Sequence, residues 1–152
     1  MDNIDRKILA QLQQNGRISL TELADTIGLS LAPCQRRVKN LENLGIITGY
    51  RAMFDASKLG LNFSAIVFVT LKNTDSTSID AFEQAVQEVN EITQAERLFG
   101  EPDYMLHVVC SNIQSFQRLY DVQLSRLPNV LRLTSTLVMK QIVNNRLLPN
   151  IS

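Results

Sequence analysis

The chain has 152 residues, of which 45% are hydrophobic and 20% charged, and its formal net charge is +0 with a pI of about 6.6. This composition is typical of one compact domain or two small ones, and it excludes a chain that binds nucleic acid through an overall positive charge. It does not exclude binding of nucleic acid through a local basic patch.

The N-terminal 46 residues are predicted to form three helices. The first carries apolar residues at helical spacing and is expected to stop near Gly16. Ser19 and Glu22 have the spacing of a capping box, which predicts a second helix that ends at Gly28. Ser30 is predicted to cap a third helix.

A short turn around Gly28 separates the second and third predicted helices. Two short helices joined by such a turn are typical of a helix-turn-helix, although many helical hairpins share the pattern, so DNA binding stays open on this evidence alone. The following stretch, "IITGYRAMF" at residues 46–54, is predicted to form a short hairpin, a wing, with Gly49 near its turn.

From residue 63 onward the pattern predicts strands and helices in the order β-α-β-β-α-β, which is the ferredoxin-like arrangement. The predicted segments are "FSAIVFVTLK" (63–72), "SIDAFEQAVQEV" (78–89), "TQAERLF" (93–99), "YMLHVVC" (104–110), "NIQSFQRLYDVQL" (112–124) and "VLRLTSTLVMKQIV" (130–143). The chain is therefore predicted to be α+β, with a winged helix-turn-helix domain over residues 1–61 and a ferredoxin-like domain over residues 62–152.

The third predicted helix separates apolar from cationic residues. On a helical wheel Cys34, Val38 and Leu41 share one side, and the opposite side and its flanks carry Ala32, Gln35, Arg36, Arg37, Lys39, Asn40 and Asn43. Arginine can donate two hydrogen bonds to guanine, asparagine and glutamine can bond adenine, and alanine leaves room in the groove. An ordinary solvated helix face would look similar, but its place directly after the turn favours base recognition.

Here the residues also carry a resemblance. "IDRKILAQLQQNGRISLTELADTIGLS" followed by "PCQRRVKNLENLGIITGYRA" closely resembles the Lrp/AsnC family of transcription regulators, and the similarity continues into "GEPDY" and "LTSTLVMKQI". The resemblance implies a DNA-binding transcription regulator whose dimers assemble into octamers and whose second domain frequently senses amino acids. Such a dimer is expected to read a palindromic operator in double-stranded DNA.

The resemblance also assigns candidate DNA-binding residues. Base recognition is expected from Ala32, Gln35, Arg36, Lys39 and Asn40. Arg37 matches an arginine of the family pattern and is expected either to contact phosphate or to be structural. Arg17 and Arg51 are candidate phosphate contacts, which position a protein on DNA without specifying sequence.

The first strand of the second domain is apolar on both faces. Phe63, Ala65 and Val67 alternate with Ile66 and Phe68, but two helices can cover only one face of a sheet. A second copy of the chain is the expected cover, because two-fold dimers dominate among oligomers.

"GEPDY", residues 100–104, is on chemical grounds a hairpin turn. The resemblance implies a further role, because the corresponding family loop lies at the contact between dimers, where a small amino acid can bind. The candidate effector residues are Gly100, Glu101, Pro102, Asp103 and Tyr104 in the loop, with Thr134, Ser135 and Thr136 on the last strand. Asp103 or Glu101 is expected to pair with the ammonium group.

Enzymatic activity is not expected, and neither are a cofactor or a metal. The single histidine, His107, lies in a predicted strand, and the sequence lacks a catalytic triad and a phosphate-binding glycine loop. Cys34 and Cys110 make neither a disulfide framework nor a metal motif, the N-terminus does not resemble a signal peptide, and the apolar runs are too short for a bilayer, which together predict a cytoplasmic protein without membrane contact.

The predicted function is that of a transcription regulator that responds to an amino acid. The alternatives are a DNA-organising protein that needs no effector and a regulatory subunit of an enzyme that never touches DNA. An RNA-binding ferredoxin-like domain is not expected, because the strands lack the aromatic-rich motif of that class.

Overall fold

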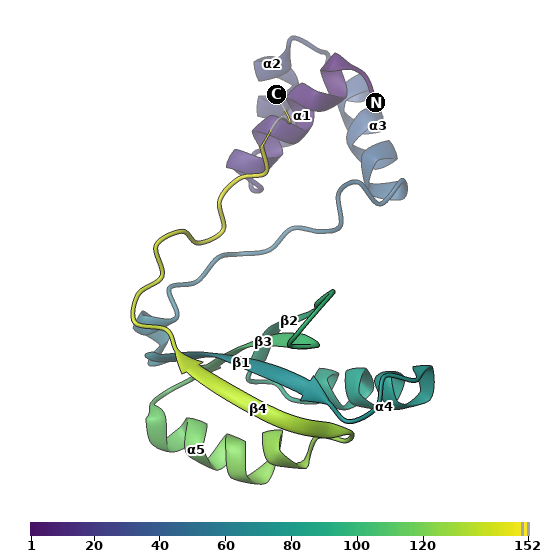
Figure 1. Cartoon of the computed structure of the whole chain (residues 1–152). Helices are drawn as coiled ribbons and strands as arrows, with labels where there is room; N and C mark the ends of the chain where they lie inside the picture. Colours follow the sequence, from purple (N-terminus) through teal and green to yellow (C-terminus); the bar gives the residue numbers. More distant parts are fainter. Residues whose placement is uncertain (150, 152) are drawn as a thin grey trace. The chain divides into compact units, whose positions relative to one another are not determined.

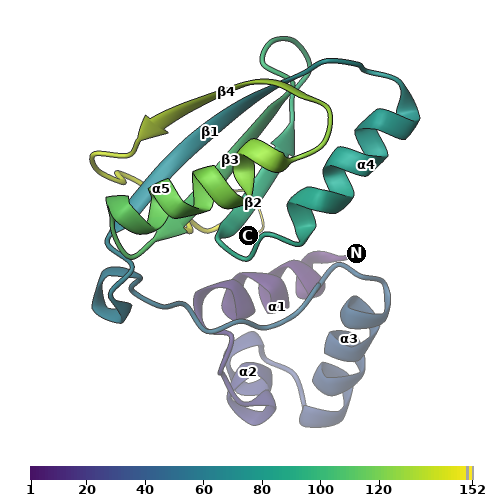
Figure 2. The same cartoon turned by 90° about the horizontal axis from the view of Figure 1, so that it is seen from below.

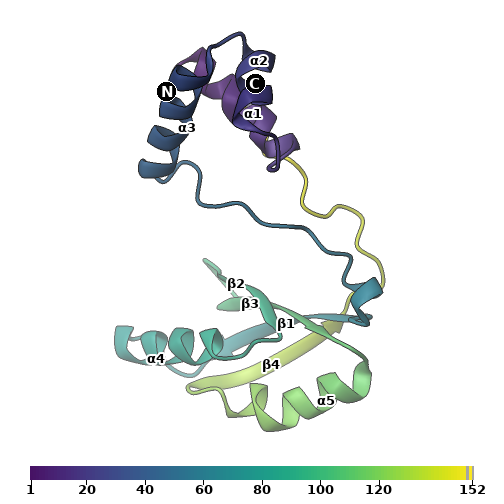
Figure 3. The ribbon, with the colours of Figure 1, turned by 180° about the vertical axis from the view of Figure 1, so that it is seen from behind.

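The computed structural model describes residues 1–149 and residue 151 (Figures 1 and 3). Two compact units are present: residues 1–53 together with 142–152, and residues 54–141. The division predicted between residues 61 and 62 is eight residues later than the division between residues 53 and 54 in the structure. The sequence also did not predict that C-terminal residues belong to the first unit. There Leu148 exchanges two backbone hydrogen bonds with the Gln13 side chain, at 2.9 and 3.2 Å.

The first unit is a bundle of three helices, α1 (Asn3–Gln14), α2 (Leu20–Ile27) and α3 (Leu31–Asn43). Their apolar faces meet in one cluster whose buried members are Ile8, Leu23, Ala24, Cys34, Val38 and Leu41. The turn between α2 and α3 depends on Gly28, which has φ 75° and adopts the left-handed conformation that glycine tolerates best. The predicted helix-turn-helix is therefore formed.

The helix caps differ in part from the prediction. The Glu22 N–H donates to Ser19 Oγ (3.1 Å), but a complete capping box lies instead at Asp2 and Asp5, at the start of α1. Ser30 occupies the cap position of α3 without a side-chain bond to the helix.

The predicted hairpin over residues 46–54 is wrong, because this segment contains no strand. A hairpin needs two extended segments that pair, and here the chain runs on without returning. Met53 and Phe54 are exposed instead, and Tyr50 donates a hydrogen bond from its hydroxyl to Glu42 Oε1 (3.0 Å). Tyr50 was not singled out by the sequence.

The second unit contains a four-stranded antiparallel sheet in the order β2-β3-β1-β4. Its strands are β1 (Phe63–Leu71), β2 (Ile92–Arg97), β3 (Tyr104–Cys110) and β4 (Val130–Leu137), and its helices are α4 (Ser76–Gln87) and α5 (Ile113–Val122), with short 3₁₀ turns η1 (Ser57–Leu59) and η2 (Leu124–Arg126). This is the predicted β-α-β-β-α-β order, although β4 ends six residues before the predicted end at residue 143.

Both helices of this unit cover the same face of the sheet (Figure 2). The core between the helices and the sheet contains every second residue of the central strands, with Val67, Val69, Leu106 and Val108 fully buried. Phe82 of α4 packs there against Tyr104, at a ring-centroid distance of 4.7 Å.

The other face, which we call the outer face, carries the remaining alternate residues. Strand register places Ile66 opposite His107, and Phe68 between Met105 and Thr134. All except the exposed Thr134 are half-buried, and neither α4 nor α5 covers them (Figure 2). This face of the sheet is therefore apolar at its centre and left uncovered by the helices of its own unit.

Candidate functional site

The α3 helix presents the predicted cationic and amide face to solvent. Gln35, Arg36, Lys39 and Asn40 are exposed, as is Ala32 in the first turn, whereas Cys34, Val38 and Leu41 are buried. Burial raises the pKa of the Cys34 thiol, so this cysteine acts as a small core residue rather than a nucleophile. The exposed set offers hydrogen-bond donors and acceptors suited to base edges in the major groove.

Arg37 differs from its neighbours. Its Nη1 donates to Asp2 Oδ2 and to Asp5 Oδ1, each at 2.8 Å, and so ties α3 to the first turn of α1. The structure therefore supports the structural role among the two that the sequence left open. Arg17, in the turn before α2, and Arg51, after α3, are both exposed.

We expect Arg37→Gln to lower the stability of the first unit at neutral pH. The Asp5 N–H and then the Arg37 guanidinium hold the pKa of Asp2 below its ordinary value. A lowered folded-state pKa stabilises the fold above the ordinary pKa, and this contribution is lost as pH falls below about 4. The difference in urea midpoint between wild type and variant should therefore shrink between pH 5 and pH 2.5. An unchanged difference across that range would contradict the pairing.

A hollow of about 480 Å³ lies where the "GEPDY" turn meets the outer face, and we call it the outer-face hollow. Its lining residues are Phe68, Thr70, Glu101, Pro102, Arg132 and Thr134. Three predicted effector residues, Glu101, Pro102 and Thr134, are thus brought together. A carboxylate, a guanidinium and hydroxyls around an apolar ring suit a small zwitterion.

Other predicted effector residues are not brought to this hollow. Ser135 pairs with Val67 and so belongs to the helix-covered face, because successive strand residues alternate between faces. Tyr104 is buried on that same side and donates from its hydroxyl to Glu83 Oε1 (2.6 Å). Thr136 is on the outer face opposite Ile66, and Gly100 forms the turn with φ 129°.

Asp103 was expected to receive an ammonium group, but the structure gives it a different task. Its Oδ2 accepts the Leu71 N–H at 2.7 Å, while its backbone N–H donates to the Val69 carbonyl at 2.9 Å. The side chain therefore extends the pairing of β1 and β3 by one bond beyond the last ladder pair.

Asp103→Ala is consequently expected to lower the free energy of unfolding of the second unit by about 1–3 kcal/mol, because the Leu71 N–H loses its partner. Denaturant unfolding measures this change. Glu101→Ala, at an exposed neighbouring position, is the control and should shift stability by less than about 0.5 kcal/mol. Equal stability of the Asp103 variant and wild type would contradict the assigned role.

Arg132 was missed by the sequence reasoning. A signal existed, because strict alternation along β4 places Arg132 on the same face as Thr134 and Thr136. In the part of the chain that the structure describes there is no cluster of metal-ligating side chains, and no helix is both long and apolar enough to cross a bilayer.

Known protein families match both the N-terminal and the C-terminal part of the chain. A family model described as winged helix-turn-helix DNA-binding matches residues 1–48, and one described as Lrp/AsnC ligand binding domain matches residues 64–148. A leucine-responsive regulatory protein of Rhizobium meliloti is 38% identical over 93% of this chain and 91% of its own length. The DNA-binding transcriptional activator DecR of Escherichia coli K12 is 34% identical over 98% of both chains.

Solved structures also match along nearly the whole chain. A transcriptional regulator from Neisseria meningitidis, solved as a complex with L-Met, superposes with a TM-score of 0.91 at 31% identity, over 98% of this chain and 96% of that one. An AsnC family transcriptional regulator from Agrobacterium tumefaciens gives 0.91 at 30% identity, over 98% and 97%.

Proposed function

The chain belongs to the Lrp/AsnC family of transcription regulators, and on that premise we propose that its α3 helix reads the operator while its second unit dimerises and binds an amino-acid effector. The observation that carries the proposal is the exposed face of α3. It consists of Gln35, Arg36, Lys39 and Asn40 and lies apart from the buried residues Cys34, Val38 and Leu41. The exposed Arg17 and Arg51 are the proposed phosphate contacts, and Ala32 allows close approach to the groove.

The outer face is the proposed dimer contact. Ile66, Phe68 and Met105 form its apolar centre, and a second copy would remove them from water. Two copies related by a two-fold axis would present two α3 helices to a palindromic operator, and further assembly into octamers follows the family pattern. The proposed place of action is the cytoplasm, and neither enzymatic activity nor a membrane partner is proposed.

The proposed effector is a free amino acid in the outer-face hollow. In this proposal Arg132 pairs with its carboxylate and Glu101 with its ammonium group, while Thr70 and Thr134 supply hydroxyls; all four line the hollow. The L-Met complex of the similar Neisseria meningitidis regulator supports this ligand class. Because Phe68 belongs both to this hollow and to the proposed dimer contact, the effector would act at that contact and shift the assembly by its difference in affinity between states.

A gel shift of the full chain with its own upstream DNA tests the proposal. Specific retardation is expected to survive an excess of unrelated competitor DNA and to change when an effector amino acid is added. Retardation that the competitor abolishes would favour the effector-independent DNA-organising protein, and no retardation at all would favour the enzyme-subunit alternative.

A further inference from the structure

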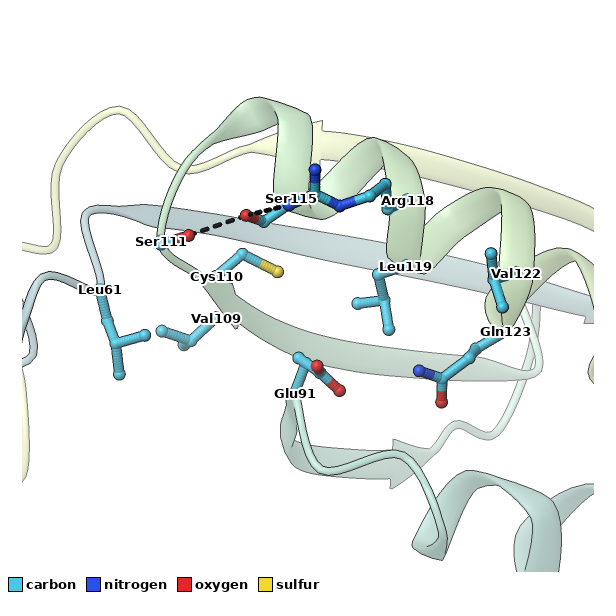
Figure 4. A pocket seen from close by; sticks show the side chains of 10 residues that line it. All are labelled: Leu61, Glu91, Val109, Cys110, Ser111, Ser115, Arg118, Leu119, Val122 and Gln123. Carbon is cyan, nitrogen blue, oxygen red and sulfur yellow. Dashed lines mark hydrogen bonds between the residues drawn. The ribbon is translucent and has the colours of Figure 1, made fainter.

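A second hollow, of about 460 Å³, lies beside α5 and away from the "GEPDY" turn (Figure 4), and we call it the α5 hollow. It is lined by Leu61, Glu91, Val109, Cys110, Ser111, Ser115, Arg118, Leu119, Val122 and Gln123. Its volume lies in the range of small-molecule sites, about 300–1,000 Å³. It shares no lining residue with the outer-face hollow.

The hydroxyl groups of Ser111 and Ser115 in the α5 hollow are joined in a short series of hydrogen bonds. Ser115 Oγ donates to Asn112 Oδ1 (3.0 Å) and accepts from Arg118 Nη2 (3.3 Å). Its one proton is then used, so in its 2.8 Å contact with Ser111 the Ser111 hydroxyl is the donor (Figure 4). Ser111 Oγ therefore keeps its lone pairs and can accept a hydrogen bond.

The α5 hollow is lined by one acidic and one basic side chain, Glu91 and Arg118, which come from different segments of the chain. Glu91 belongs to the segment before β2, where its carbonyl accepts the Val109 N–H at 2.9 Å and so fixes the backbone. Arg118 belongs to α5 and uses one of its five donors on Ser115. Figure 4 shows Arg118 on the helix in the upper part of the picture and Glu91 in the lower part.

The floor of the hollow is apolar. Leu119 and Cys110 are 5% and 4% exposed, and Leu61 and Val122 stand at its edges. Burial, and next the charge of Glu91, raise the pKa of the Cys110 thiol, which keeps it neutral as part of that floor. The site thus combines a carboxylate and a free hydroxyl acceptor, a guanidinium and an apolar wall.

We propose that the α5 hollow is a second ligand site, which binds a free amino acid with an apolar side chain. Glu91 and Ser111 accept hydrogen bonds from the ammonium group, Arg118 donates to the carboxylate, and Leu61, Leu119 and Val122 contact the side chain. Leu61 lies just before β1, within the second unit, so the whole site belongs to that unit.

The test is calorimetric titration of the full chain with L-leucine, L-methionine and L-phenylalanine as probes. The chain carries Arg132→Gln, which removes the carboxylate contact proposed for the outer-face hollow. We expect at least one probe to bind saturably. Adding Glu91→Gln or Arg118→Gln should weaken that binding by at least about tenfold, because each removes a charged partner. N-acetyl-L-leucine, which lacks the ammonium group, and L-leucine amide, which lacks the carboxylate, should bind at least tenfold more weakly than L-leucine.

Matched controls are Glu88→Gln and Arg126→Gln, at exposed acidic and basic positions outside the hollow; both should leave probe affinity unchanged. The proposal is overturned if no probe binds the Arg132→Gln chain saturably, or if binding survives both Glu91→Gln and Arg118→Gln. Operator binding in the absence of amino acids tests the proposed function separately, so the two can fail independently.

Discussion

Phe68→Glu is expected to be a folded monomer. Phe68 lies at the centre of the outer face, with Met105 and Thr134 as its strand neighbours. In a dimer formed through this face, an unpaired carboxylate would be removed from water, which destabilises the contact by about 3–5 kcal/mol, or roughly a thousandfold in dissociation constant. The side chain points away from the helix-covered core, so the sheet itself should stay intact.

Sedimentation velocity over a concentration series measures this effect. Ile113→Glu, which adds the same charge at an exposed apolar position of α5, is the matched control and should assemble as wild type does. A Phe68→Glu chain that keeps the wild-type sedimentation profile would contradict the proposed dimer face.

Phe82→Ala is expected to lower the free energy of unfolding of the second unit by about 3–5 kcal/mol. Phe82 is 0% exposed, packs on the ring of Tyr104 and contributes to the core between α4 and the sheet. Its removal leaves a cavity that the surrounding side chains, held in place by the paired strands and α4, fill only in part.

Denaturant unfolding of the full chain, followed by the circular dichroism of the sheet, measures the loss. Phe99→Ala is the control, because Phe99 is fully exposed in the loop after β2 and its truncation removes no core contact. A loss below about 1 kcal/mol for Phe82→Ala would place the core of this unit elsewhere.

Local patterns were sufficient to predict most of the architecture. Helical spacing of apolar residues around Ile8, Leu23 and Val38 and strand alternation around Val67 and Leu106 each reflect burial, and both units bury those residues. The prediction of a wing hairpin over residues 46–54 was wrong, because a hairpin depends on pairing between two segments, which no local pattern specifies.

The candidate sites were predicted less completely, for the same physical reason. The exposed face of α3 follows from helix geometry alone, so Arg36 and Lys39 were placed correctly on the solvent side. The structural tasks of Arg37 and Asp103 depend on partners distant in sequence, Asp5 and Leu71, and were not predictable from spacing. The α5 hollow likewise joins residues from Leu61 to Gln123 that only the folded sheet brings together.

The central claim is that α3 reads operator DNA. Its most direct test is the DNA affinity of Arg36→Ala, measured by fluorescence anisotropy at one salt concentration. The two DNAs compared are the chain's own upstream DNA and unrelated DNA of equal length. The expected loss is about 1–3 kcal/mol on the operator and much less on unrelated DNA, because a base contact contributes to specific binding alone. Arg6→Ala, at an exposed arginine of α1, should change neither affinity appreciably. An equal loss on both DNAs, or no loss on either, would contradict base recognition by this helix.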